Sequence, residues 1–272
     1  MRERSGQPLP VQHRTLFLSD LHLGAVGARA DLVLRFLRRN RAETYVLVGD
    51  VLDLWQPVLP QWGKAHQGVI DHLIRRSAAG AALVYIAGNH DTAPETAPLT
   101  RRLPVTAQAE WLHETADGRR FLVTHGDAED RRALQSHLLT RIGSRIDNGL
   151  RRLDRSLRHS LSWRSPALDP QRRSVIEWIL STANALFYPD RGHERRLIAR
   201  ARDLGLDGVI CGHFHIAALH DRHGLIYANC GDWMDSFTAL AEDGDGRLSL
   251  VGGRAAFARA PRPVPAGGAV RV

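Results

Sequence analysis

Five short motifs built from Asp, His and Asn side chains occur in order along the chain. They are Asp20-Leu-His22, Gly49-Asp50, Gly88-Asn89-His90-Asp91, His125-Gly126-Asp127 and Gly212-His213-Phe214-His215. Mixed imidazole and carboxylate ligands suit Mn²⁺, Fe or Zn²⁺, whereas Mg²⁺ and Ca²⁺ prefer shells made of oxygen. Two such cations about 3.5–4 Å apart can clamp a phosphoryl group and generate hydroxide near neutral pH. The motifs therefore indicate a metal site of a kind that can act on a phosphoryl group.

Each motif follows a segment that we predict to be a buried strand. Helical patterns at Ala28–Arg39 and Gly63–Ala78 separate the first three strands, and this alternation predicts parallel pairing in an α/β fold. Open α/β sheets bind ligands at the carboxyl ends of their strands, so we expect the motifs to meet there. The five strands are Thr15–Ser19, Thr44–Val48, Ala82–Ala87, Arg120–Thr124 and Gly208–Cys211.

The remaining segments divide the chain into a core, an insertion and two tails. We predict a core over 14–128 and 204–251, a helical insertion (a lid) over 129–203, a flexible N-terminus over 1–13 and a disordered tail over 252–272. Within the core we expect hairpins and strands at Gln108–Glu114 with Arg120–Thr124, at Ala217–His220, at Leu225–Asn229, and at Ser236–Ala241 with Arg247–Val251.

In this order, the motifs resemble those of the calcineurin-like metallophosphoesterases over residues 15 to about 240. The resemblance implies a four-layer α/β/β/α sandwich. It implies one metal ion on Asp20, His22, Asp50 and His215, and a second on Asp50, Asn89, His125 and His213, with Asp50 bridging the two. It further implies that His90 binds the substrate phosphate and protonates the leaving group, while Asp91 orients His90.

Three longer segments resemble the UDP-2,3-diacylglucosamine diphosphatase branch of this superfamily. They are Ser19–Gly24, Gly49–Trp55 and Asn229–Trp233. That branch hydrolyses a lipid-linked nucleotide sugar to UMP and a diacylated sugar phosphate in bacterial lipid A synthesis, and carries a helical insertion over its active site. This chain departs from the branch at His90, where Arg is usual, and at Phe214, where Thr is more usual.

The insertion carries a helical stripe of leucines flanked by arginines. Leu150, Leu153, Leu157 and Leu161 fall on one helix face, and Arg151 and Arg155 lie off it. We predict that Arg151, Arg155 and Trp178 bind the substrate, and that the basic helix rests on an anionic membrane. The alternative is that these helices simply pack on one another and on the sheet. Trp55, Trp178 and Trp233 either line the cleft or pack in the core.

Composition and charge limit the class of protein. Hydrophobic residues make up 43% and charged residues 24% of 272 residues, which is typical of a globular protein. The net charge of +8 comes from residues 129–202, which hold 16 Arg and 8 acidic residues, while the rest has 21 of each sign. This clustering indicates an anionic partner.

Localisation and rival functions follow from the same sequence. Only Cys211 and Cys230 are present, and no signal peptide or spanning segment is apparent, so we expect a cytoplasmic protein, peripheral at the inner membrane. The alternatives are another phosphodiesterase or phosphatase acting on nucleotides or nucleic acid, and a non-catalytic scaffold. Nucleic acid is disfavoured because the basic residues lack an accompanying aromatic pattern.

Overall fold

The computed structural model describes residues 9–25, 27–53, 61–91, 103–129 and 192–257. Most of the predicted insertion lies outside these residues, and so do Arg151, Arg155, Trp178 and Trp55. Within the described parts of the chain, no helix is long and apolar enough to cross a membrane.

The first sheet has six strands in the order β11-β10-β1-β2-β3-β4. Strands β1 to β4 are parallel, as the alternation of strands and helices predicts, and β10 joins the edge of β1 antiparallel. The strands are β1 (Val11–Leu18), β2 (Asn40–Val48), β3 (Ala82–Ile86), β4 (Ala107–Gln108), β10 (Thr238–Glu242) and β11 (Leu248–Gly252).

The second sheet has five strands in the order β5-β6-β7-β9-β8. Strands β6, β7 and β9 are parallel, and the predicted hairpin of β5 and β6 is antiparallel. The strands are β5 (Glu110–Glu114), β6 (Arg120–Thr124), β7 (Gly208–Cys211), β8 (Ala218–His220) and β9 (Ile226–Asn229).

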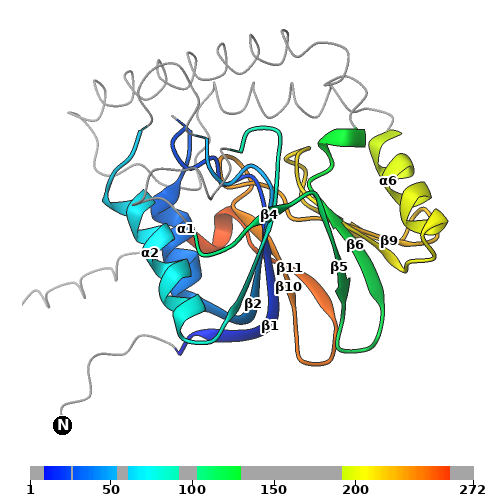
Figure 1. Cartoon of the computed structure of the whole chain (residues 1–272), viewed down its shortest axis with the longest axis horizontal. Coiled ribbons are helices and arrows are strands. Elements are labelled where there is room, and N and C mark those ends of the chain that lie inside the picture. Colours follow the sequence, from blue (N-terminus) through cyan, green and yellow to red (C-terminus); the bar gives the residue numbers. More distant parts are fainter. Residues whose placement is uncertain (1–8, 26, 54–60, 92–102, 130–191, 258–272) are drawn as a thin grey trace, which may run out of the picture.

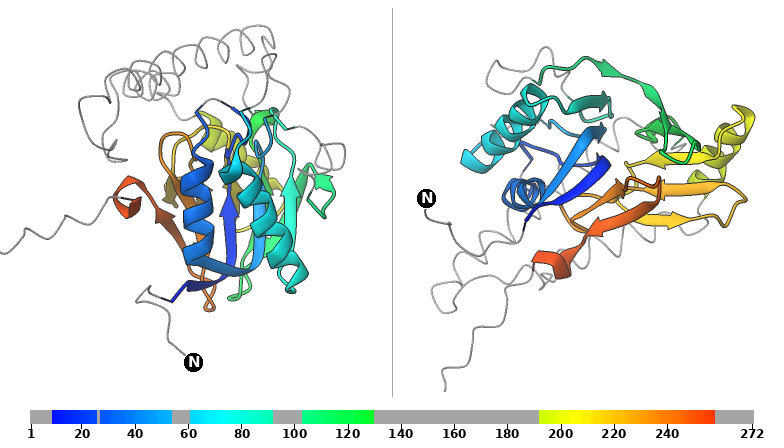
Figure 2. Two further views of the ribbon diagram at one scale, coloured as in Figure 1. Left: turned by 90° about the vertical axis from the view of Figure 1, so that its left-hand side faces the viewer. Right: turned by 90° about the horizontal axis from the view of Figure 1, so that it is seen from below.

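Helices cover the outer faces of the two sheets, which pack on each other in the middle (Figure 1; Figure 2). Helices α1 (Ala30–Arg39) and α2 (Lys64–Ala78) lie on the first sheet, and α6 (Gly192–Asp203) lies on the second. Short 3₁₀ turns occupy Asp127–Glu129 (η2) and Arg254–Phe257 (η4). The predicted α/β/β/α sandwich is confirmed.

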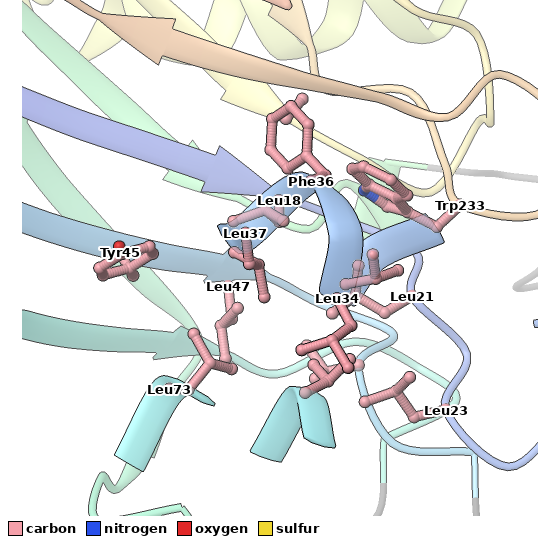
Figure 3. Packing of buried hydrophobic residues seen from close by; sticks show 14 of the residues in the cluster. Leu18, Leu21, Leu23, Leu34, Phe36, Leu37, Tyr45, Leu47, Leu73 and Trp233 are labelled. Atoms are coloured by element: carbon pink, nitrogen blue, oxygen red, sulfur yellow. The ribbon is translucent and has the colours of Figure 1, made fainter. Parts of the chain in front are cut away.

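Each interface between layers has its own apolar core. The first lies between the helices and the first sheet and includes Leu37, Leu73 and Trp233, whose indole packs near Phe36 (Figure 3). The second lies between the sheets and includes Phe17, Phe121 and Ile210. The third lies beneath α6 and includes Leu197 and Phe214. Trp233 is fully buried, so it is a packing residue and does not line a cleft.

Three predicted boundaries differ from the structure. Strand β1 begins at Val11, inside the predicted flexible N-terminus, because Val11 pairs with Asn40 of β2. Residues 192–203 were placed in the insertion, but α6 buries its apolar face on the second sheet. The C-terminal tail was predicted to be disordered from Gly252, yet Phe257 is buried against Trp233 and Phe237. In each case the segment has few apolar residues of its own and is held in place by contacts with residues distant in the sequence.

Candidate metal centre

The five motifs meet where strands of both sheets end. Asp20, Asp50 and Asn89 follow β1, β2 and β3 of the first sheet. His125 and His213 follow β6 and β7 of the second. The parallel strands of each sheet deliver their carboxyl ends to one edge, as expected.

Six of the seven predicted metal ligands form two compact groups. Asp20, His22 and His215 make one group, and Asp50, His125 and His213 make the other. In the first group, Asp20 Oδ1 lies 3.8 Å from His22 Nε2 and 3.2 Å from His215 Nε2. Ligand atoms that share one cation at about 2.1 Å lie roughly 3–4 Å apart, so both spacings suit a shared metal ion.

Asp50 faces both groups at once. Its Oδ1 lies 3.4 Å from His125 Nε2, and its Oδ2 lies 3.7 Å from His22 Nε2. One carboxylate oxygen is therefore available to each of two neighbouring cations, which is the geometry that a bridging ligand requires.

Several buried ligand atoms at this site lack a hydrogen-bond partner among the described residues. They include Asp20 Oδ1, His22 Nε2 and His125 Nε2. Leaving buried polar atoms unpaired costs about 1–3 kcal/mol each, so native proteins rarely keep them without a ligand. The donor set and the unpaired atoms both fit divalent cations. The cations would be held by six side chains, those of Asp20, His22, Asp50, His125, His213 and His215.

The backbone is strained at five of these residues. Asp20, His22, Asp50, His213 and His215 have φ between 44° and 65°, the left-handed region that residues with a side chain seldom adopt. Such conformations cost of order 1–3 kcal/mol each and persist only where the surroundings enforce them. The fold thus holds the ligands in place at the expense of its own stability.

Glycines in the motifs allow the ligand loops to approach one another. A Cβ on Gly212 would lie 1.6 Å from Ser19 Oγ and 2.6 Å from Asp20 Oδ2. A Cβ on Gly49 would lie 2.2 Å from His125 Nδ1, and one on Gly88 would lie 2.3 Å from Asp50 Oδ1. These contacts explain the Gly in three of the four motifs that contain one.

Asp91 supports the loop that carries Asp50. Its carboxylate accepts hydrogen bonds from the backbone N–H groups of Asp50, Val51, Leu52 and Gly88, and from the Tyr85 hydroxyl. We predicted that Asp91 orients His90, but these contacts turn the carboxylate toward the backbone of the Asp50 loop.

Asp53 faces the His90 ring and was not among the predicted site residues. Its Oδ2 lies 3.5 Å from His90 Nδ1 and 3.4 Å from His22 Nδ1, and its side chain is 4% exposed. A single buried carboxylate thereby faces the outer nitrogens of two histidines. The available signal was a second Asp three residues after Asp50 in Gly49-Asp-Val-Leu-Asp53.

Charges at the site reinforce one another. Burial alone would lower the pKa of His125 and of His215, but the carboxylates of Asp50 and Asp20 respectively outweigh it and raise both to about 10. Burial would raise the pKa of Asp20, but His215 and His125 lower it to about 2. In the metal-free protein these histidines therefore carry protons that a cation must displace.

His90 and Asn89 lie at the rim of the site. The N–H of His90 donates to Asp50 Oδ1 at 2.8 Å, and the His90 side chain is 14% exposed. Burial lowers the pKa of His90, but Asp53 and Asp50 more than compensate and raise it above its usual value. The Asn89 side chain is exposed beside His90, and its role as a metal ligand stays a prediction.

Asn229 supports the loop of the last motif. It is fully buried at the end of β9, and its amide donates to the carbonyl of Gly212 at 2.8 Å, while its carbonyl accepts from Gly231 N–H at 2.9 Å. Asn229 thus links the Gly212–His215 loop to the segment that follows β9.

The chain is similar to known proteins in sequence and in structure. Residues 13–217 match the family model described as calcineurin-like phosphoesterase. The chain is 24% identical over 239 residues to proteins named UDP-2,3-diacylglucosamine hydrolase from two strains of Neisseria meningitidis, of serogroups C and B, covering 85% of this chain and 95% of each relative. A solved structure of Yfce, a phosphoesterase from E. coli, aligns with a TM-score of 0.43 at 15% identity over 87% of this chain and 97% of its own. With three quarters of its length matched and its ligand residues gathered at one edge, the chain belongs to the calcineurin-like phosphoesterase family of metal-dependent phosphoester hydrolases.

Proposed function

We propose that this protein hydrolyses the pyrophosphate bond of a UDP-2,3-diacylglucosamine-like substrate, yielding UMP and a sugar 1-phosphate. The observation that carries the hydrolytic part is the position of Asp50, which offers one oxygen to each of two ligand groups. We infer two divalent ions, most simply Mn²⁺, with Fe or Zn²⁺ as alternatives for the same mixed ligands.

Bound cations would supply Lewis-acid charge for the phosphoryl oxygens and a nucleophile from water. The residues of the chain would do the rest. Asp20, Asp50 and the four histidines would hold the cations where strands of both sheets end. His90, whose side chain is 14% exposed, would neutralise charge on the phosphoryl group or protonate the leaving oxygen. Asp53 would hold the His90 ring through its Nδ1.

The finer substrate assignment is supported by the curated relatives. They are named for UDP-2,3-diacylglucosamine, and the match extends over nearly their whole length. A nucleotide sugar of this kind presents phosphates to a metal centre and acyl chains to an apolar surface. Arg151, Arg155 and Trp178 remain our proposed contacts to it, and the basic insertion remains our proposed contact with an anionic inner-membrane surface on the cytoplasmic side.

A substrate panel tests the assignment. Purified protein loaded with Mn²⁺ would be incubated with UDP-2,3-diacylglucosamine, UDP-N-acetylglucosamine and bis-p-nitrophenyl phosphate, and products would be measured by mass spectrometry. We expect UMP release from the diacylated substrate at least tenfold faster than from the sugar without acyl chains. Equal rates on both nucleotide sugars would reject the lipid assignment while leaving the metal centre intact.

A second candidate is a phosphodiesterase or phosphatase acting on other esters, and the contact between Asp53 and His90 favours it. A protonated imidazole helps most when the leaving group is an alkoxide, since a departing phosphate is already a weak base. If bis-p-nitrophenyl phosphate and simple alkyl phosphodiesters were cleaved while UDP-sugars were not, this candidate would replace the first.

A further inference from the structure

Helix α6 contacts the loop of the last motif through a ring stack. The His193 ring, in the first turn of α6, lies 3.9 Å from the Phe214 ring, centroid to centroid, at an interplanar angle of 24°. His193 is 3% exposed and Phe214 is 1% exposed. Phe214 is the middle residue between His213 and His215, so the stack acts on the loop that carries two of the proposed ligands.

The loop needs support from outside itself. His213 and His215 both have positive φ, at 65° and 56°, on either side of Phe214. Strained backbone of this kind relaxes unless neighbouring structure prevents it. Hydrogen bonds from Asn229 to the Gly212 carbonyl and from the His213 N–H to Asp20 restrain its backbone. The Phe214 ring adds a restraint from the core beneath α6, in which it is buried.

Phe214 also borders the other ligand loop. A Cβ on Gly126, directly after His125, would lie 3.2 Å from Phe214 Cε2. The ring therefore sits against the backbone that presents His125 as well as the backbone that presents His213 and His215. Moving it would disturb ligands of both groups.

The first turns of α6 are themselves firmly fixed. Glu194 is buried, and its Oε2 lies 3.4 Å from His220 Nε2 and 3.2 Å from His223 Nε2, on β8 and the turn that follows it. The Arg196 guanidinium donates to the carbonyl of Glu129 from Nε at 2.9 Å and Nη2 at 2.7 Å. His193 is thus held on a rigid support and can in turn hold Phe214.

We propose that His193 is a positioning residue for the metal centre, because its ring holds Phe214 and so keeps the His213–His215 loop in the conformation that binds metal. This inference rests on the proposed ligand roles of His213 and His215. Without the stack, the metal-free loop populates other conformations. The apparent affinity for metal then falls in proportion to the fraction of molecules whose loop is in the binding conformation.

The experiment measures Mn²⁺ affinity by calorimetry on the full chain, comparing wild type with His193→Ala and His193→Phe. Because an aromatic stack stabilises the loop only modestly, we expect His193→Ala to weaken Mn²⁺ binding roughly threefold to tenfold. His193→Phe keeps a ring and is expected to restore affinity to within about twofold of wild type. In a Phe214→Ala background, His193→Ala should cause no further loss, since the pair acts as a unit.

Leu73→Ala is the control for a general loss of stability. Leu73 is 1% exposed in the core between the helices and the first sheet, away from α6. This variant should melt at a lower temperature and bind Mn²⁺ as wild type does. Wild-type affinity in folded His193→Ala would overturn this inference alone. Failure of the wild type to bind Mn²⁺, Fe²⁺ or Zn²⁺ would overturn the metal centre itself.

Discussion

At the scale of single residues, the site depends on carboxylates with separate tasks. Asp20 and Asp50 face the positions of the cations, Asp91 accepts hydrogen bonds from the loop of Asp50, and Asp53 faces the outer nitrogens of His22 and His90. A carboxylate behind a metal-binding imidazole fixes the tautomer and the ring orientation. All four are the same residue type, so their different roles follow from the geometry of the fold.

Asp53→Asn tests the role assigned to this carboxylate. The change keeps the size of the side chain and removes its charge, so we expect turnover to fall by about 10- to 100-fold while the chain stays folded. Steady-state rates with Mn²⁺, together with metal content by mass spectrometry, provide the measurement. Asp31→Asn, at an exposed pair with Arg29, serves as the matched control. Unchanged turnover in Asp53→Asn would remove Asp53 from the mechanism.

At the scale of elements, a buried hydrogen bond joins the two sheets away from the metal centre. His113 Nε2 on β5 lies 2.8 Å from Glu242 Oε2 on β10, and Glu242 also accepts from the Ala116 N–H and from Arg14. The Glu242 side chain is fully buried. Burial would raise its pKa, but the hydrogen bonds, led by that from His113, lower it to about 2.

The low pKa of Glu242 determines how its contribution to the free energy of unfolding changes with pH. Glu242 binds a proton more readily in the unfolded chain, near pH 4.5, than in the folded one, so its contribution is present above pH 4.5 and is lost as the pH falls toward 2. We expect Glu242→Gln to lower the free energy of unfolding by about 1.5–3 kcal/mol at pH 7. The difference from wild type should be smaller at pH 3.

Urea unfolding of the metal-free protein at pH 7 and pH 3 measures this change. Glu43→Gln, on an exposed position of β2, provides the control and should match wild type at both values. A difference between wild type and Glu242→Gln that stayed constant with pH would contradict the assigned pKa.

At the scale of the whole molecule, the metal centre spans the junction of the two sheets. Asp20 and Asp50 follow strands of the first sheet, whereas His125, His213 and His215 follow strands of the second. Each of the two ligand groups takes residues from both sheets. Bound cations would therefore join the halves of the sandwich, and binding would be coupled to overall stability.

Proton release on metal binding is the corresponding prediction. His125 and His215 have pKa values of about 10 in the metal-free protein, so both carry protons at pH 7.5. Because a metal binds only neutral imidazole, loading the site should release about two protons, and the affinity should weaken as the pH falls.

Calorimetry in two buffers of different ionisation enthalpy counts the released protons. Asp50→Asn removes the carboxylate that both groups share and should abolish most of the heat and the proton release together. Metal binding by the wild type without proton release would show that these histidines are already neutral.

The sequence by itself determined the order of strands and helices and the motifs at the strand ends. Alternating apolar segments separated by helical patterns predicted a parallel sheet, and the spacing of Asp20, Asp50, His125 and His213 after those strands placed the ligands at one edge. These features are local, because each depends on residues adjacent along the chain. The packing of α6 on the second sheet and the burial of Phe257 depend on distant contacts, so they were not predicted.

Only the tertiary structure decided which groups face one another. Asp53 and Asp91 are the same residue type. The fold turns Asp53 toward His22 and His90, and it turns Asp91 toward backbone N–H groups. The stack of His193 on Phe214 joins residues 21 positions apart, across a helix and a strand. Such pairings depend on loop conformation and side-chain direction, which residue type and spacing along the chain leave open.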